Sequence, residues 1–395
     1  MQKKNKHKKP IQIPRYRGVI LAALILLSCL VWNSLSFGRV IAASTTTKLI
    51  QTETAETPWG LALDTGNHIW IAEPGCDAAP VCASNFPGSI GEYDIRNASL
   101  IRNYSQPQGF AGPLFLAVDT SNHIWFTEPG NNALGELIPG PQPLWRQWKI
   151  PTTAAIPYQI LVDHNGNLWF SEFGSGDIGF FNPHSQHFIE NALPTANSHP
   201  YGLTLDRFGT IWIAENSAGK LASFIPNPTG KVRINERSIP TPSPHLLTSD
   251  SQGHIWYSAG FYGSIGRFTP ATGQIIQYQV SRNACKTPPN CQGTHISGIA
   301  ADKQGIIWFD DSLAQRLGNL NPTTGIVKNT NVADVIHPQP HPHDGLIIDA
   351  QGDLWCTEEF ANRLIELPAP IPHKHKPPKK INQGKTFRFY SPGFK

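Results

Sequence analysis

One pattern recurs seven times along this chain of 395 residues and restricts the folds open to it. In every copy an aspartate is followed six positions later by a tryptophan, and successive copies begin 43 to 55 residues apart. The pairs are Asp64/Trp70, Asp119/Trp125, Asp163/Trp169, Asp206/Trp212, Asp250/Trp256, Asp302/Trp308 and Asp349/Trp355. Self-similarity with a period of about 20–50 residues is the signature of a fold built from stacked, equivalent units.

The residues within one copy predict four β-strands. Residues 199–240 contain four stretches of alternating, β-branched or aromatic residues, which are separated by short turns rich in Gly, Asn and Pro. Four antiparallel strands in each of seven units predict an all-β fold, a seven-bladed β-propeller whose blades bury their faces against one another. We expect the repeated aspartates to hold strand-to-turn junctions and the tryptophans to pack between blades.

The last copy lacks one strand. Strands are expected at 345–349, 353–357 and 363–367, after which the copy stops at Pro368. Residues 47–54 precede the first copy and have the composition of a strand without a partner. We predict that this segment completes the last blade and so removes an exposed sheet edge. The propeller is then expected over residues 45–367, followed by a basic, proline-rich tail at 368–395.

The first 44 residues are predicted to be a targeting segment. A basic stretch precedes an uncharged run from residue 18 to residue 38. This run is either the core of a signal peptide that is cleaved near Ala43 or one hydrophobic helix that anchors the chain in a membrane. In both cases the positive-inside rule puts the rest of the chain outside the cytoplasm. We therefore expect an exported propeller, anchored through residues 18–38 or secreted.

The distribution of charge argues against nucleic acid as a partner. The net charge of +4 comes from the two ends, because residues 1–18 and 368–395 each hold seven basic side chains and no acidic one. The residues between them carry 18 basic and 28 acidic side chains. An acidic body is a poor match to a phosphate backbone. We expect instead a monomer that binds a small molecule or a peptide at the mouth of the propeller channel.

Four cysteines form two short clips. Cys76 and Cys82 flank five residues that include a proline, and so do Cys285 and Cys291. In an oxidising compartment the simple interpretation is two disulfides, each of which closes a small loop. A zinc site made by all four cysteines is the alternative. Cys356 is expected to be a buried thiol.

The repeats resemble those of a known family. Their consensus is P-x-G-[LI]-x-x-D-x-x-G-x-[LI]-W-[FI]-x-E, followed by I-G-x-[FL] and P-x-T-G, and HNGNLWFSEFGSGDIGFFNP at His164–Pro183 matches it closely. This pattern is similar to that of the streptogramin B lyase family, also called virginiamycin B lyases. The resemblance implies a seven-bladed propeller that opens a cyclic depsipeptide by elimination at an ester, using Mg²⁺ and a histidine base.

The resemblance also indicates where a catalytic base would lie. Counting back five residues from Asp349 puts Asp344 in the position implied for the base, with His343 one place before it. A substrate-contacting histidine of the family corresponds to Ser297, two residues from His295. A histidine that is flanked by a carboxylate and lies near a cation can act as a base near neutral pH. We therefore expect His343 and Asp344 to be the catalytic pair.

The expected metal ligands follow from acids that depart from the repeat. One metal-binding glutamate of the family corresponds to Glu358 or Glu359, and the other falls near His341 or Pro342. The acids at 310–311 and 358–359 are doubled, which leaves one carboxylate of each pair beyond the structural need of the repeat. Carboxylates that face one cavity can hold a hard cation. We predict Mg²⁺, with Ca²⁺ as the alternative, bound by His341, Glu358 and Glu359.

Five further side chains are expected to contact the ligand at the same mouth, namely His245, His295, Tyr158, Tyr201 and Trp59. Aromatic rings at a concave mouth suit a flat, apolar ligand, although they can equally plug the channel. Two function classes remain open. One is a metal-assisted lyase or a related hydrolase that acts on a cyclic ester or lactone. The other is a non-catalytic propeller that binds a peptide, a sugar or a protein at the cell surface.

Overall fold

The computed structural model describes residues 48–51, 57–75, 87–96, 99–282, 293–333 and 339–368. The chain divides into two compact units, Met1–Ser44 and Thr45–Lys395, and every described residue belongs to the second unit. Among these residues we find no helix with the length and apolarity needed to cross a membrane. Several predictions concern residues outside the described ranges and remain predictions: the leader 1–44, the tail 369–395 and the clip cysteines Cys76, Cys82, Cys285 and Cys291.

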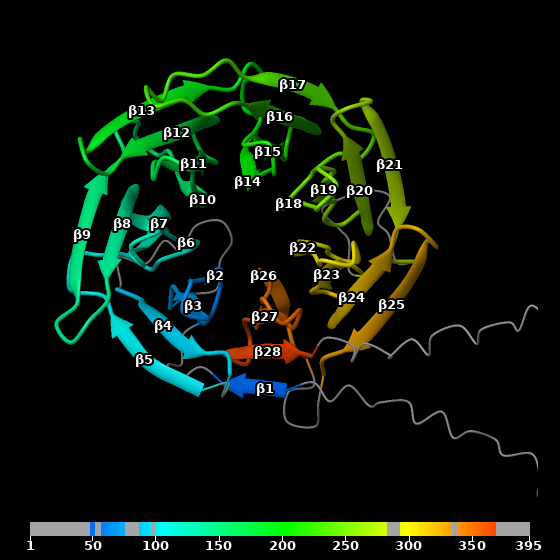
Figure 1. The fold of residues 1–395 in the computed structure, drawn as a ribbon, viewed down its shortest axis with the longest axis horizontal. Helices are drawn as coiled ribbons and strands as arrows, with labels where there is room; N and C mark the ends of the chain where they lie inside the picture. Colours follow the sequence, from blue (N-terminus) through cyan, green and yellow to red (C-terminus); the bar gives the residue numbers. More distant parts are fainter. Residues whose placement is uncertain are drawn as a thin grey trace, which may run out of the picture. The chain divides into compact units, whose positions relative to one another are not determined.

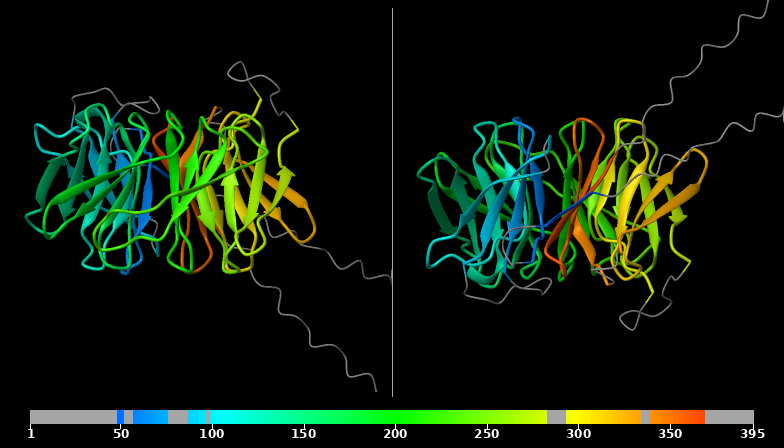
Figure 2. Two further views of the ribbon diagram at one scale, coloured as in Figure 1. Left: turned by 90° about the horizontal axis from the view of Figure 1, so that it is seen from above. Right: turned by 90° about the horizontal axis from the view of Figure 1, so that it is seen from below.

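Seven four-stranded antiparallel sheets form a ring, and each sheet is one blade (Figure 1). Six blades use four consecutive strands, while the seventh takes its outer strand from the beginning of the chain. Seen edge-on, the strands of each blade run between the two faces of the ring (Figure 2). The one helical element among the described residues is a short 3-10 turn, η1 (Pro129–Asn131). The predicted seven-bladed β-propeller is confirmed.

In blades 1 to 6 the strands run in chain order from the channel outward, whereas in blade 7 the outermost strand is β1. Blades 1 to 4 consist of β2 (Leu61–Leu63), β3 (His68–Glu73), β4 (Ser89–Asp94) and β5 (Ser99–Ser105); β6 (Leu116–Val118), β7 (Ile124–Glu128), β8 (Ala133–Ile138) and β9 (Leu144–Lys149); β10 (Pro157–Val162), β11 (Leu168–Glu172), β12 (Asp177–Asn182) and β13 (His187–Ala192); and β14 (Pro200–Leu205), β15 (Ile211–Glu215), β16 (Lys220–Phe224) and β17 (Asn235–Ser238). Blades 5 to 7 consist of β18 (Leu247–Ser249), β19 (Ile255–Ser258), β20 (Ser264–Thr269) and β21 (Gln274–Gln279); β22 (Ile299–Ala301), β23 (Ile307–Asp311), β24 (Arg316–Asn321) and β25 (Ile326–Asn331); and β26 (Pro342–Ile348), β27 (Leu354–Glu358), β28 (Arg363–Leu367) and β1 (Lys48–Gln51).

Blade 7 closes the ring by joining the two ends of the propeller. Strand β1 pairs antiparallel with β28, with Lys48 opposite Glu366 and Gln51 opposite Arg363. Without β1, strand β28 would present an unpaired edge of N–H and C=O groups. The prediction that residues 47–54 supply the missing outer strand is therefore confirmed for residues 48–51.

In every blade the repeated aspartate links its turn to the tryptophan. One carboxylate oxygen accepts the backbone N–H groups two and four positions further on, and in blade 3 Asp163 does so from Asn165 at 2.8 Å and Asn167 at 3.0 Å. The other oxygen accepts the indole N–H, at 2.8–3.1 Å across the seven blades. The indole of Trp169 packs against the ring of Phe224 in the next blade, with ring centroids 4.7 Å apart. Both repeated residues thus serve the fold, as expected.

A second repeated position holds a buried acid three residues after the tryptophan in every blade except blade 5. The acids have no exposed area and are Glu73, Glu128, Glu172, Glu215, Asp311 and Glu358. Three of them accept a backbone N–H from the segment that leads into the blade: Glu128 from Ala111 at 3.0 Å, Asp311 from His295 at 3.0 Å and Glu358 from His341 at 2.6 Å. Burial raises the pKa of Glu128 and of Glu215 to about 7, and that of Glu172 to about 8.

These buried acids predict that the melting temperature decreases as the pH rises from about 4.5 to about 8. The folded-state pKa values of Glu128, Glu172 and Glu215 lie above the ordinary value of 4.5, so the folded chain holds more protons than the unfolded chain in this range. Their contribution to stability is present below the unfolded-state pKa and is lost as the pH rises through the folded-state values. Thermal melts followed by circular dichroism test this. The variant Glu172→Gln, which stays neutral, should show a smaller fall, and an equal fall in both proteins would contradict the assignment.

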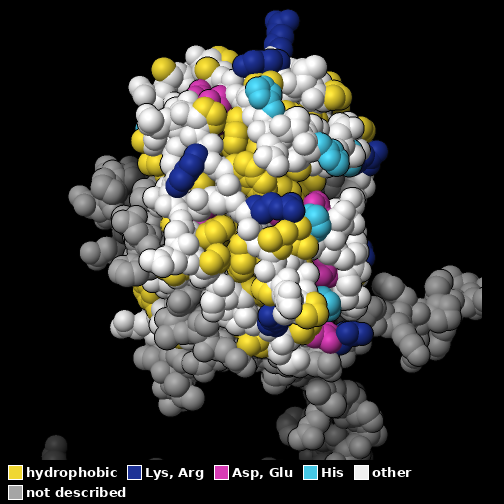
Figure 3. All heavy atoms as spheres, turned by 90° about the vertical axis from the view of Figure 1, so that its left-hand side faces the viewer, with side chains coloured by type: hydrophobic (Ala, Val, Ile, Leu, Met, Phe, Trp, Pro, Cys, Tyr) yellow, Lys and Arg dark blue, Asp and Glu magenta, His cyan; other side chains and the backbone are white. Residues whose placement is uncertain are grey.

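The outer edge of the ring is amphipathic, whereas the interior of each blade is buried. Every residue of β7, β11 and β15 is buried, but β9 alternates between exposed and half-buried residues. In Figure 3, which views the side of the ring where β9 lies, apolar side chains are interspersed with basic, acidic and histidine side chains. None of the predicted site residues belongs to an outer strand. The chemistry-bearing groups lie instead at the channel.

Candidate functional site

The inner strand of blade 7 contains one residue more than its counterparts. Each of these inner strands contains a β-bulge between its first paired residue, a proline, and its next paired residue. Across this bulge β10 and β14 each contain one residue more than the strand they pair with, whereas β26 contains two more. The residue directly after the paired proline is Tyr158 in β10, Tyr201 in β14 and His343 in β26. Asp344, within this bulge, adopts the left-handed backbone conformation with φ of 52°. Counted forward from the paired proline, His343 is equivalent to Tyr158 and Tyr201, whereas counted back from Asp349 the equivalent residue is Asp344.

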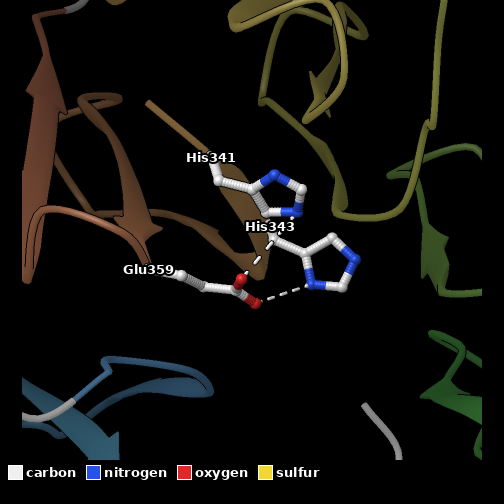
Figure 4. A group of neighbouring side chains, drawn as sticks. All are labelled: His341, His343 and Glu359. Atoms are coloured by element: carbon white, nitrogen blue, oxygen red, sulfur yellow. Dashed lines mark ion pairs between the residues drawn. The ribbon is translucent and has the colours of Figure 1, made fainter. Parts of the chain in front are cut away.

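Three side chains with metal-binding atoms come together at this mouth (Figure 4). His341 directly precedes β26, His343 is the second residue of this strand, and Glu359 directly follows β27. The Nδ1 atom of His343 lies 3.1 Å from Oε1 of Glu359, and the Nε2 atom of His341 lies 3.8 Å from Oε2 of the same carboxylate. One donor atom from each of the three residues falls within 4.8 Å of the others. We call these three residues the His–His–Glu group.

Backbone contacts fix the two segments that carry the group. The N–H of His341 donates to Oε1 of Glu358 at 2.6 Å, and the N–H of Glu359 donates to the carbonyl of His341 at 3.2 Å. Glu358 also accepts from the N–H of Phe360 and from Nε of Arg363. Glu358 thus serves the repeat, as its equivalents do in other blades. Of the two doubled acids predicted as ligands, it is Glu359 that faces the histidines.

The electrostatic surroundings shift the pKa values of His341 and His343 in opposite directions. Burial opposes charge on His343, whose side chain is 7% exposed, but the nearby carboxylates of Asp344, Glu359 and Asp310 outweigh this and raise its pKa to about 10. Burial and repulsion from His343 lower the pKa of His341 to about 4. These carboxylates therefore stabilise a proton on His343 and leave His341 neutral at neutral pH.

Two further histidines from other blades continue the row. The ring of His295 stacks on that of His343, with centroids 5.3 Å apart, and its Nε2 lies 3.3 Å from Nε2 of His245. His245 donates from Nδ1 to the carbonyl of Ser243, so its Nε2 is assigned as the acceptor and Nε2 of His295 as the donor. Burial lowers the pKa of both rings, which keeps the pair neutral. The structure thus brings His245 and His295 together with His343, although they are far apart in sequence.

The three aromatic residues expected at the mouth lie buried in the channel. Trp59 is 1% exposed, Tyr158 is fully buried and Tyr201 is 6% exposed. The two tyrosine hydroxyls contact each other, and both donate to Oδ2 of Asp344, at 3.0 Å and 3.2 Å. Burial and the Asp344 charge raise the pKa of both tyrosines far above its ordinary value, so they remain donors. This arrangement is that of a channel plug, with Asp344 joining blades 3, 4 and 7.

A cavity of about 420 Å³ lies along the inner strands and has Asp344 in its wall. The remaining lining comes from the inner strands of all seven blades, for example Leu63, Leu203, Thr248 and Ile348. Asp344 belongs both to this wall and to the surroundings of His343. This residue therefore joins the channel cavity to the row of histidines.

Two aromatic residues of the mouth were not singled out from the sequence. Phe360 stacks on His341 with centroids 4.5 Å apart, and Phe261 lies 4.4 Å from His295. Each belongs to the turn that follows the second strand of its blade. Their sequence signal is a shared position, two residues after Glu358 in blade 7 and two residues after Ala259, which replaces the repeated acid, in blade 5. Phe360 is 57% exposed, so it offers an apolar surface beside the His–His–Glu group.

The donor atoms of this group do not fit the cation implied by the resemblance. Mg²⁺ and Ca²⁺ prefer oxygen ligands, whereas imidazole nitrogen suits transition metals. Two of the three donors here are imidazole nitrogens, and only Glu359 contributes oxygen. The prediction of Mg²⁺ or Ca²⁺ at His341, Glu358 and Glu359 thus has little chemical support from this arrangement.

Comparisons with known proteins bear on the identity of the repeats. The chain is similar to virginiamycin B lyase from Staphylococcus aureus, with 22% identity and a TM-score of 0.66 over 82% of this chain and 100% of that one. A catalytically inactive form of the same enzyme with quinupristin matches at 21% identity and a TM-score of 0.67, over 82% and 99% of the two chains. YCF48 bound to D1 peptide matches at 12% identity and a TM-score of 0.59, over 82% and 95%.

At these identities the structural matches establish the fold alone. No curated protein matched the chain. The model of the virginiamycin B lyase family matches residues 72–224, which comprise most of blades 1 to 4. This match confirms, over residues 72–224, the resemblance to the virginiamycin B lyase family that the repeat motifs indicate.

Proposed function

We propose that the mouth of blades 5 to 7 opens a cyclic ester or lactone by elimination, with His343 as the base. The observation that carries this proposal is the register of β26. Counted from the paired Pro342, His343 falls at the position that the resemblance implies for the base, and Glu359 lies 3.1 Å from its Nδ1, which supports this role. A base that is oriented by a carboxylate on its other ring nitrogen is a recurrent catalytic arrangement.

Each residue of the mouth has a definite part in this reaction. Glu359 holds Nδ1 of His343, so that Nε2 on the far side of the ring is the atom that takes the proton. The proton comes from a carbon next to a carbonyl, its electron pair forms a carbon–carbon double bond, and the ester oxygen leaves as a carboxylate. Asp344, Glu359 and Asp310 raise the pKa of His343 to about 10, so only the fraction of the ring that has lost its Nε2 proton can act as the base, and the rate should rise with pH towards that value. His295 stacks on this ring and limits its rotation.

The reaction is written without a metal ion, because the residues brought together do not suit Mg²⁺ or Ca²⁺. We propose that it takes place outside the cytoplasm, in a chain that is either anchored through residues 18–38 or released by cleavage near Ala43. This part of the proposal is supported by the uncharged run at residues 18–38, which follows a basic segment.

A panel of cyclic depsipeptides, lactones and linear esters, incubated with the full chain and analysed by mass spectrometry, tests the proposal. Elimination converts a cyclic ester into an open isomer of the same mass that absorbs as a conjugated alkene, whereas hydrolysis adds one water. We expect the isomer from cyclic esters. The absence of any turnover across the panel would refute the proposal.

A second candidate is a propeller that binds without catalysis. The observation that favours it is the plug, because Trp59, Tyr158 and Tyr201 are buried and leave their channel positions closed. A similar fold, that of YCF48, is known bound to a peptide. Saturable binding of a cyclic peptide, with no change in the mass of that peptide, would support this candidate over the lyase.

A further inference from the structure

We propose that His341, His343 and Glu359 form a three-ligand site for a transition-metal ion of the Zn²⁺ class. The proposal does not rest on the proposed function. It rests on the disagreement between the oxygen-seeking cation that the resemblance implies and the nitrogen-rich donors that this chain presents. Imidazole binds Zn²⁺, Co²⁺ and Ni²⁺ well, and two histidines with one carboxylate are an established zinc ligand set.

The spacing of the donor atoms is close to what such an ion requires. Zinc–ligand bonds of about 2.0–2.2 Å put neighbouring ligand atoms about 3–3.5 Å apart. Oε1 of Glu359 lies 3.1 Å from Nδ1 of His343, and Oε2 lies 3.8 Å from Nε2 of His341. Because the three donor atoms already fall within 4.8 Å of one another, small side-chain rotations would bring them to bonding distance.

The group is also held in place by its surroundings. The backbone hydrogen bond from Glu359 to His341 ties the two segments, and Phe360 stacks on the His341 ring. The edge of Trp59 contacts the His343 ring, with centroids 5.2 Å apart. Ligands on pre-positioned segments lose little conformational entropy when the ion binds. Rigid support of this kind distinguishes the group from histidines that gather by chance on a surface.

Three protein ligands leave one coordination position open. Zinc sites with three protein ligands keep the fourth position for water or substrate, whereas structural sites are closed by four. His341 has a side chain that is 20% exposed, so the group can be reached from solvent. The site therefore has the form of an accessible metal centre at the channel mouth.

Metal binding and the proposed base reaction would use the same imidazole. An ion bound to Nδ1 of His343 would take the place of the contact between this atom and Glu359. The remaining ring proton would then be on Nε2, so Nε2 could not accept a proton from the substrate. If the proposed function holds, added Zn²⁺ should inhibit ester opening. This consequence rests on the proposed function, but the metal site itself does not.

Metal binding to the full, tag-free chain after treatment with chelator tests the site directly. We expect one Zn²⁺ per chain by calorimetry, and a Co²⁺ complex with the visible absorption of a low-coordinate nitrogen and oxygen site. Mg²⁺ should not displace either ion. The variants H341A, H343A and E359Q should each weaken Zn²⁺ binding by about 100-fold or more, since loss of even an outer partner of a ligand costs about 10–100-fold.

Two controls make the result specific. His199 packs against Phe173 elsewhere on the mouth and H199A should bind Zn²⁺ as the wild type does. H373A/H375A tests the histidines of the tail in the same way. The proposal is overturned if the three ligand variants bind like the wild type, if H373A/H375A removes the binding, or if Mg²⁺ competes equally. Should H343A fail to fold, H341A and the isosteric E359Q decide the question. Turnover is not measured, so this outcome is separate from that of the proposed function.

Discussion

Replacing His343 by alanine should lower the rate of ester opening by about 10²–10⁴-fold, the usual cost of losing a general base. Nε2 of this imidazole is aimed away from Glu359 and is the atom that takes the proton when the ring is neutral. The loss should appear mainly in kcat, because the base acts on the reacting proton rather than on binding. Steady-state kinetics on whichever cyclic ester is opened by the wild type provide the measurement.

Two companion variants separate chemistry from folding. Glu359→Gln keeps the shape of the side chain but removes the charge that orients His343, so it should also slow the reaction. His199→Ala removes another histidine of the same mouth, which contacts Ser217 and Phe173, and should leave the rate unchanged. Turnover that survives in both His343→Ala and Glu359→Gln would show that the chemistry lies elsewhere on the propeller.

Deleting residues 45–55 should destabilise the whole ring rather than fray one end of it. The deletion removes strand β1, whose four residues pair with β28, and leaves β28 as an open edge. Cross-strand pairs contribute about 0.2–1 kcal/mol each, so four pairs represent about 1–4 kcal/mol. That is a large part of the 5–15 kcal/mol typical of a folded protein. Thermal and urea denaturation should show one cooperative transition at lower temperature and lower urea concentration.

A complementation experiment provides the control for this deletion. A synthetic peptide of residues 45–55 should add back to the edge of β28 and restore the melting temperature, since an extended peptide can complete an exposed sheet edge. A peptide of the same composition in scrambled order should not. If the truncated chain melts like the full chain, the closure by β1 does not stabilise the ring.

The sequence determined the architecture because its signals are local and repeated. An aspartate and a tryptophan six residues apart lie in one turn and one strand, so their hydrogen bond forms within a single blade and recurs with each copy. Strand alternation and turn residues are likewise short-range. The missing strand of the last copy could be inferred by counting, and β1 supplies it. Seven blades and their closure therefore followed from pattern alone.

The candidate site depended on the tertiary structure because its parts come from distant segments. The row of His245, His295 and His343 joins three blades, and no local pattern specifies which rings will touch. A count along the chain cannot tell how many residues a β-bulge absorbs, and only the pairing of β26 with β27 shows that two additional residues lie between Pro342 and Leu346, the segment that holds both His343 and Asp344. Pairing across a sheet and packing around a channel are long-range interactions, and only the folded chain makes them.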